Sequence, residues 1–347
     1  MSMIKNILIV KYGALGDVVR TSFFAKPVRM QSTIGGSRVR LHWLTAPQSA
    51  PLLRFNPYID VILTDPNEIK DIKFDEIYSL DDEDDILASV SKLHSFNTIG
   101  ASLSDEGKKI YCNRSASWFD MGLLSKHGKE YADNLKRLND RSHSDIFKEI
   151  FKVNDVDFNF YNSDQINRNT YEMLESHSKD KFAIGLNAFA GNRWPAKALP
   201  DKELPKLAYQ LSRLMINGKS IHLFLLGSGL DLQRNKDFVM NNAAHGNITA
   251  LNTDSNILDL AAVVRSLELL ITADSLCLHL AVGQQVPTIA FFAPTSAAEM
   301  ENLSSFRKIK SLSDDYCSYK PNADNSTITS ERIIFEVRQL LGASIDG

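Results

Sequence analysis

Short apolar runs alternate with amphipathic stretches through the first half of the chain. Residues 7–10 read Ile-Leu-Ile-Val, a run typical of a strand buried on both faces of a sheet. Stretches with apolar residues three or four positions apart are typical of helices that cover such a sheet. The pattern predicts strands at residues 7–10, 39–44, 59–63, 75–80 and 98–101, and helices at 17–31, 47–55, 84–93 and 144–153.

The same alternation returns in the second half of the chain. It predicts strands at residues 182–187, 221–226, 248–251, 269–272 and 288–292, and helices at 201–215, 231–241, 257–266, 275–283 and 329–341. Strands that alternate with helices form parallel sheets, so the predicted fold class is α/β. Weak periodicity at 102–141 predicts loops and short helices, and the polar segment 160–180 is the expected link between the two blocks.

The two blocks predict an N-terminal domain at residues 1–165 and a C-terminal domain at 180–325. A last helix within 326–347 is expected to pack back across the domains. A length of 347 residues agrees better with two cores than with one. Because two α/β blocks follow one another, a ligand cleft between them is the default expectation.

Composition excludes several classes of protein. Hydrophobic content of 44% and a net charge of -3 describe an ordinary globular chain with no overall attraction to nucleic acid. The three cysteines are widely spaced, which argues against a disulfide framework or a zinc site. The beginning of the chain does not resemble a signal peptide, and no apolar run reaches the ~20 residues of a membrane span. We therefore expect a cytoplasmic protein that has at most peripheral contact with the inner face of a membrane.

Charge is unevenly distributed along the chain. Residues 1–60 carry eight basic side chains and two acidic ones, whereas residues 65–85 are strongly acidic. This asymmetry is compatible with an anionic ligand near the first segment and equally with two solvated faces of opposite sign. The sequence Asp82-Glu83-Asp84 has the spelling of a metal-binding Asp-x-Asp motif, but its place in an acidic run before a helix favours a solvated face.

The first strand leads into a glycine turn, Gly13-Ala14-Leu15-Gly16-Asp17, and then into a helix. Glycines permit a tight turn and a close approach of the backbone to a ligand. Asp17 at the helix start is a candidate catalytic base. The alternative interpretation is an N-cap, because aspartate is favoured there.

Three strand-to-helix turns of the second block carry further candidates. Lys197 lies on a long loop together with Arg193 and can reach a diphosphate as a point charge, or it is a surface lysine beside two prolines. Asp274 and Ser275 precede a helix whose first amides suit a phosphate.

His279 lies one turn further on the same side as Ser275, where it faces an anion or is a buried core histidine. The third turn contains Gly227 and Asp231. An acid in that place can hold ribose hydroxyls, or it can be a first-turn residue favoured by the helix dipole.

Taken together, these stretches resemble glycosyltransferase family nine, the ADP-heptose:lipopolysaccharide heptosyltransferases and their relatives. The matching residues run in the family's order over about residues 4 to 340. They are Ile7 to Val18, Asn56-Pro57-Tyr58-Ile59-Asp60, Trp194-Pro195-Ala196-Lys197 with Pro200, Asp274-Ser275, His279-Leu280-Ala281, Val286-Pro287-Thr288, Phe292 and Pro294-Thr295. Two positions depart from the family pattern: Leu276 stands where a glycine is usual, and Asn187 begins Asn-Ala-Phe-Ala rather than Asn-Pro-Gly-Ala.

The resemblance implies a GT-B architecture of two Rossmann-like domains whose parallel sheets face across a cleft, with the acceptor on the first and the nucleotide-sugar on the second. It implies inverting, metal-independent transfer of a sugar, heptose above all, from ADP-heptose to a hydroxyl of a lipopolysaccharide-core or related glycan. The donor is a substrate, so no cofactor is expected.

The resemblance also implies roles for individual residues. Asp17 is the expected base, and the expected acceptor and sugar side comprises Gly13, Gly16, Arg20 and Arg54. The expected donor side comprises Lys197, Asp274, Ser275, His279, Asp231 and Gly227. Two alternatives stay open: a protein O-heptosyltransferase of the same fold, and a non-catalytic sugar-nucleotide-binding protein.

Overall fold

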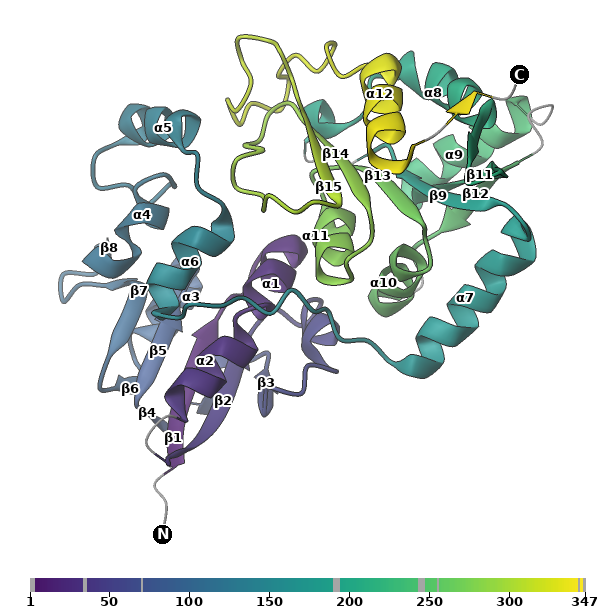
Figure 1. Ribbon diagram of the computed structural model, residues 1–347. Coiled ribbons are helices and arrows are strands. Elements are labelled where there is room, and N and C mark those ends of the chain that lie inside the picture. The colour runs from purple at the N-terminus through teal and green to yellow at the C-terminus, as the bar shows by residue number, and fades with distance from the viewer. Residues whose placement is uncertain are drawn as a thin grey trace. The chain divides into compact units, whose positions relative to one another are not determined.

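The computed structural model describes residues 4–33, 36–69, 71–189, 194–242, 247–254, 256–342 and 344–345. The chain forms two compact units, whose elements are drawn in Figure 1. Unit 1 comprises Met1–Tyr161 together with Ala298–Glu301. Unit 2 comprises Asn162–Ala297 together with Asn302–Gly347.

Unit 1 is built on a six-stranded sheet in the order β3-β2-β1-β5-β7-β8. All neighbouring pairs are parallel except β7 and β8. A separate two-stranded sheet pairs β4 with β6. The strands are β1 Ile4–Val10, β2 Arg38–Leu44, β3 Val61–Leu63, β4 Lys73–Phe74, β5 Glu76–Ser79, β6 His94–Ser95, β7 Thr98–Leu103 and β8 Lys109–Tyr111.

Helices cover both faces of this sheet, because alternate residues of each strand point to opposite sides. Ile7 of β1 packs with Phe24 and Phe147 on one face, and Leu8 packs with Ile86 on the other. Burying a side chain of this size contributes about 1.5–3 kcal/mol. The helices are α1 Leu15–Ser22, α2 Ala25–Ser32, α3 Asp84–Val90, α4 Ala116–Phe119, α5 Lys129–Leu138 and α6 His143–Phe151, with 3-10 turns at Ala50–Leu53, Pro66–Ile69 and Asn113–Ser115.

Unit 2 is built on an eight-stranded sheet in the order β15-β14-β13-β9-β11-β10-β16, and β12 also pairs with β11. Six strands pair in parallel: β15, β14, β13, β9, β11 and β12. Strand β10 runs antiparallel to its neighbours β11 and β16. The strands are β9 Phe182–Asn187, β10 Leu214–Ile216, β11 Lys219–Gly227, β12 Ile248–Asn252, β13 Leu269–Ala273, β14 Thr288–Phe292, β15 Phe306–Lys310 and β16 Ser344–Ile345.

The helices of unit 2 pack against this sheet (Figure 1). On one face, Leu186 of β9 is buried with Leu207 of α8 and Val337 of α12. The helices are α7 Asp164–Ser178, α8 Glu203–Ser212, α9 Gly229–Asn241, α10 Ile257–Arg265, α11 Leu276–Gly283 and α12 Ser330–Leu341, with a 3-10 turn at Pro195–Lys197. Within the described residues, no helix is long and apolar enough to cross a bilayer.

The α/β fold class predicted from the sequence is confirmed, and one local expectation is corrected. The helix predicted at 17–31 is broken into α1 and α2, as a proline within it predicts, because Pro27 lacks the N–H that would continue the first helix onto Phe23. The predicted link at 160–180 is mostly helix α7. Only Thr170, Leu174 and Ser178 of α7 are buried, so its apolar stripe is too thin to stand out in the sequence.

His42 and His222 are buried imidazoles, one in each unit. Burial lowers the pKa of each to about 4, from about 6.5 in an unfolded chain. Between these values the unfolded chain binds protons that the folded chain does not, so stability falls as the pH drops from about 6.5 towards 4. A shift of this size corresponds to at most about 3 kcal/mol for each histidine.

We expect the double variant His42→Gln/His222→Gln to lose less stability than wild type between pH 7 and pH 4.5. Urea unfolding of the full chain at both pH values measures the difference. The exposed His94→Gln is the matched control and should follow wild type. Equal pH dependence in the double variant and in wild type would contradict the assignment.

Gly227 lets α9 approach the end of β11 closely. A Cβ at this position would lie 2.7 Å from Asn235 Nδ2 and 2.9 Å from the backbone N of Leu232. Asn235 Nδ2 also donates to the carbonyl of Leu226 at 3.1 Å, so it has little room to retreat. Gly227 is therefore required for packing of the helix onto the strand.

We expect Gly227→Ala to destabilise the chain by about 1–3 kcal/mol, the usual cost of overpacking. Gly122→Ala is the control, because its nearest neighbour outside the adjacent residues would be the Phe119 carbonyl at 3.6 Å. Thermal unfolding of both variants checks the expectation, and equal melting temperatures would contradict it.

Candidate functional site

The strand order of unit 1 reverses between β1 and β5. From β1 the chain moves outward to β2 and β3, and from β5 it moves outward to β7 on the other side. Loops that follow two such strands diverge, and ligands of α/β sheets bind in the crevice between them. The loops at this position are 11–14 after β1 and 80–83 after β5.

Asp81 joins these two loops. Its side chain is buried, and Oδ1 accepts from Lys11 Nζ at 2.6 Å while Oδ2 accepts from the backbone N–H of Tyr12. Burial opposes the charge of Lys11, but the nearby carboxylates of Asp81 and Asp17 outweigh it and raise the pKa of Lys11. The predicted solvated acidic face therefore begins after Asp81, at the exposed Glu83.

Asp17 lies inside α1, at its third residue. The N-cap position is occupied by Ala14, so the N-cap interpretation of Asp17 is wrong. Its carboxylate contacts two cations instead: Oδ1 lies 2.8 Å from Arg20 Nη2, and Oδ2 lies 3.9 Å from Lys11 Nζ. The side chain is 30% exposed, which leaves it accessible to a substrate.

The glycines of the turn do not carry its unusual backbone. The positive φ of 47° belongs to Ala14, and Gly16 is already helical. Gly13 faces the loop after β5, because a Cβ there would lie 3.0 Å from Glu83 Oε1. Arg54 is exposed at the end of the 3-10 turn, with its guanidinium over the Phe55 ring at 5.7 Å.

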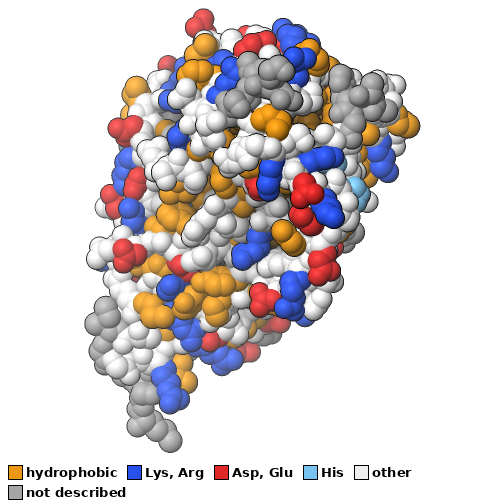
Figure 2. Space-filling model, turned by 45° about the vertical axis from the view of Figure 1, so that its right-hand side comes forward, with side chains coloured by type: hydrophobic (Ala, Val, Ile, Leu, Met, Phe, Trp, Pro, Cys, Tyr) orange, Lys and Arg blue, Asp and Glu red, His pale blue; other side chains and the backbone are white. Residues whose placement is uncertain are grey.

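Most of the basic residues in the first segment are neutralised within unit 1. Ion pairs join Lys5 to Glu76, Lys11 to Asp81, Arg20 to Asp17, Lys26 to Asp157 and Arg29 to Asp60. On the face shown in Figure 2, basic and acidic side chains are intermixed. The excess of positive charge in residues 1–60 is thus a weaker argument for an anionic ligand than the sequence suggests.

The strand order of unit 2 reverses between β9 and β13. Asn187, the last residue of β9, bridges this position: its Nδ2 donates to Thr272 Oγ1 at 3.2 Å and to Ser275 Oγ at 2.8 Å. Ser275 is the N-cap of α11, and its side chain makes no capping hydrogen bond. Asn187 therefore fixes the turn at the start of α11.

Lys197 and Asp274 form an ion pair beside this turn. Lys197 Nζ lies 2.9 Å from Asp274 Oδ2 and donates to the Asp274 carbonyl at 3.0 Å. Both side chains are less than one fifth exposed, so the surface-lysine interpretation is wrong. Burial opposes the charge of Asp274, but the positive charges of Lys197 and His279 outweigh it and lower the pKa of Asp274.

His279 is buried on α11 and lies close enough to Asp274 to lower the pKa of the Asp274 carboxyl. Four of the predicted donor residues, Lys197, Asp274, Ser275 and His279, are therefore gathered at the β9–β13 reversal.

Asp231 lies in the first turn of α9, next to the more distant strand β11. Its Oδ1 is 3.9 Å from Arg234 Nη1, and the Arg234 guanidinium stacks over the Phe189 ring at 4.2 Å. Arg193, the second predicted cation of the loop after β9, lies outside the described residues.

Sequence reasoning overlooked Asp81 and Asn187 as site residues. Each is a polar residue at or just after the carboxyl end of a buried strand, which is the signal that could have identified it. Among the described residues, no cluster of histidine, cysteine or carboxylate side chains has the arrangement of a metal site.

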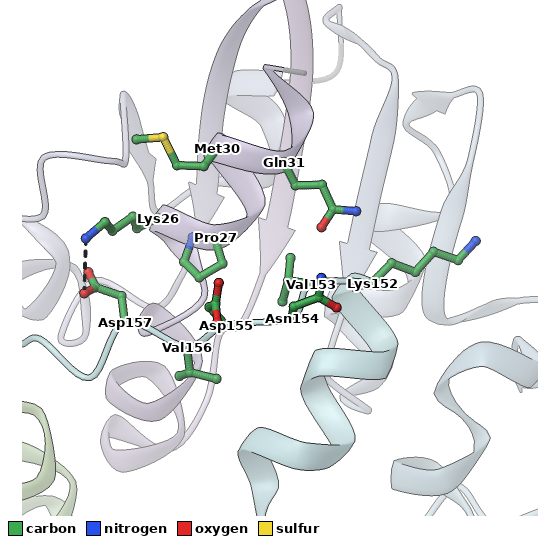
Figure 3. Close-up of a pocket in the computed structure, with 10 residues that line it drawn as sticks. All are labelled: Lys26, Pro27, Met30, Gln31, Lys152, Val153, Asn154, Asp155, Val156 and Asp157. Atoms are coloured by element: carbon green, nitrogen blue, oxygen red, sulfur yellow. Dashed lines mark ion pairs between the residues drawn. The ribbon is translucent and has the colours of Figure 1, made fainter. Parts of the chain in front are cut away.

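A separate hollow of about 560 Å³ lies elsewhere in unit 1, between α2 and the segment after α6. Lys26 and Asp157 pair across one end of it at 3.6 Å (Figure 3). It contains none of the predicted site residues.

Comparison with known proteins follows the same division of the chain. Residues 164–327, which lie mostly in unit 2, match the model of glycosyltransferase family 9 (heptosyltransferase). A search of curated protein sequences gives no match.

Solved structures of similar fold match nearly the whole chain. A family 9 glycosyltransferase from Veillonella parvula has a TM-score of 0.73 at 18% identity, with 98% of each chain covered. The E. coli ADP-heptose lipopolysaccharide heptosyltransferase II has a TM-score of 0.64 at 15% identity, with 97% of this chain and 98% of that chain covered. E. coli heptosyltransferase WaaC with ADP has a TM-score of 0.61 at 13% identity, with 96% and 99% covered.

These structures share the GT-B heptosyltransferase fold with this chain, and the expected fold is confirmed. The sequence match at residues 164–327 adds a similarity in sequence to this likeness in fold. The chain thus has the GT-B fold, and residues 164–327 are similar to glycosyltransferase family 9 (heptosyltransferase).

Proposed function

We propose that the protein is an inverting glycosyltransferase that moves heptose from ADP-heptose to a hydroxyl of a lipopolysaccharide-core or related glycan, without a metal ion. The observation that carries this proposal is Asp17, an accessible carboxylate at the β1–β5 reversal that contacts two cations and does not cap its helix. The names of the similar structures, which include ADP and ADP-heptose, support the choice of donor.

In the proposed reaction, Asp17 takes the proton of the acceptor hydroxyl as that oxygen attacks the anomeric carbon of the donor. The bond from this carbon to the diphosphate oxygen breaks, and its electron pair leaves with the diphosphate. Attack from the opposite face inverts the anomeric centre, as in inverting glycosidases.

The residues of the β9–β13 reversal stabilise the leaving group in this proposal. Lys197, His279 and the first amides of α11 face the growing negative charge on the diphosphate. Fixed donors of this kind contribute about 3–4 kcal/mol each. Asp274 holds the ammonium of Lys197 in place, and Asp231 binds the ribose.

We expect Asp17→Asn to reduce turnover by about 10²–10⁴-fold, the usual contribution of a general base. Folding and ADP binding should be unchanged, since the amide is isosteric. Transfer from radiolabelled ADP-heptose to a Kdo-bearing lipid A acceptor measures the effect, with a protein acceptor tested in parallel.

Asp60→Asn is the control for this variant, because Asp60 also pairs with an arginine of unit 1, Arg29 at 2.6 Å. Near-normal turnover of Asp17→Asn would refute its role as the base. Labelling of the protein acceptor alone would favour the O-heptosyltransferase, and donor binding without transfer would favour a non-catalytic binding protein.

We expect ADP to raise the melting temperature of the chain, because a ligand at 100 times its Kd stabilises the native state by about 2.7 kcal/mol. The variant Lys197→Met/Asp274→Asn removes both charges, so neither is left buried alone. Its shift with ADP should shrink while its shift with adenosine, which lacks the diphosphate, stays the same. Equal losses with both ligands would argue against contact between Lys197 and the diphosphate. Larger shifts with UDP or GDP than with ADP would show that the donor carries a nucleobase other than adenine.

A further inference from the structure

Arg20 is held by three groups of unit 1. Its Nη2 lies 2.8 Å from Asp17 Oδ1, and its Nη1 lies 3.4 Å from Glu299 Oε2. The guanidinium also lies over the ring of Trp118, with 5.2 Å from Cζ to the ring centroid. Arg20 and Glu299 are each only 12% exposed, so this arrangement is poorly screened by solvent.

Glu299 comes from a distant part of the sequence. Residues Ala298–Glu301 follow β14 in the chain, yet they belong to unit 1. The Glu299 carbonyl accepts from the backbone N–H of His143 at 2.8 Å, and Glu301 Oε1 accepts from Ser144 Oγ at 2.5 Å. Two contacts with the start of α6 therefore fix the backbone on both sides of the Glu299 side chain.

Trp118 is fixed by the same helix. Its ring meets the ring of His143 edge-on at 5.4 Å and that of Phe147 at 5.2 Å. The aromatic face under Arg20 and the carboxylate beside it are thus both anchored to α6. A planar guanidinium with a fixed face and a fixed edge has little freedom to rotate.

We propose that Glu299 is a positioning residue for Asp17 and acts through Arg20. The inference rests on the proposed function, in which Asp17 is the acceptor base. Glu299 fixes one edge of the guanidinium, so the other edge holds Asp17 Oδ1 in a single orientation. Glu299 also offsets part of the positive charge of Arg20, which leaves Asp17 a stronger base than a fully charged guanidinium alone would.

The other charged groups around Asp17 remain in place when Glu299 is changed. They include Lys11 just after β1, Asp81, which pairs with Lys11, and Arg20 on α1 itself. A change in pH dependence on substitution of Glu299 therefore reports the link through Arg20.

The test compares Glu299→Gln with Glu301→Gln in the full chain. Glu301 lies two residues away on the same segment, and a glutamine oxygen there can still accept from Ser144. We expect Glu299→Gln to lower kcat by about 10–100-fold, since misplacement by about 1 Å can cost 10²-fold. The KM for ADP-heptose should be unchanged, and the acidic limb of the pH–rate profile should move to lower pH. Glu301→Gln should match wild type in all three.

Two results separate this inference from the proposed function. Wild-type chain that transfers no sugar to any acceptor would overturn both. Wild-type chain that transfers sugar, with Glu299→Gln equal to Glu301→Gln in kcat and in pH profile, would overturn the inference alone. In the Asp17→Asn background, Glu299→Gln should lower the residual rate no further, and a full additional loss would overturn the inference as well.

Discussion

The reversal of strand order in each parallel sheet is the constraint on which both candidate sites depend. At the reversal, the loops after two neighbouring strands turn away from each other and leave a crevice at the carboxyl ends of these strands. In unit 1 this crevice lies between β1 and β5, and in unit 2 it lies between β9 and β13. Polar groups that join the two loops lie beside the crevice where a ligand would bind, because the apolar residues of the strands end there.

An ion pair between a lysine and an aspartate lies at each of the two reversals. Lys11 pairs with Asp81 in unit 1, and Lys197 pairs with Asp274 in unit 2. A buried ion pair adds little net stability, because desolvation offsets most of the attraction, but loss of one partner is costly. These pairs therefore define geometry more than they stabilise the fold. Each holds a charged side chain at a fixed point next to the place where substrate chemistry is proposed.

The sequence predicted elements better than it predicted partners. Buried strands such as β9 stand out because their apolar runs are continuous, whereas the mostly exposed helix α7 has too few buried residues to do so. Asp17 and Lys197 were identified by their place in strand-to-helix turns. Their partners follow from contacts between residues far apart in the chain, as with Lys197 and Asp274 or with Arg20 and Glu299, which no local pattern encodes.

The excursion of Ala298–Glu301 into unit 1 has a consequence for synthesis of the protein. A nascent chain that has emerged as far as Tyr161 contains every strand of the first sheet. It still lacks the carboxylate beside Arg20 and the acceptor for Ser144, which arrive only after most of unit 2 has been made. An isolated N-terminal half is therefore an incomplete unit, because unit 1 is completed by a segment from the far end of the chain.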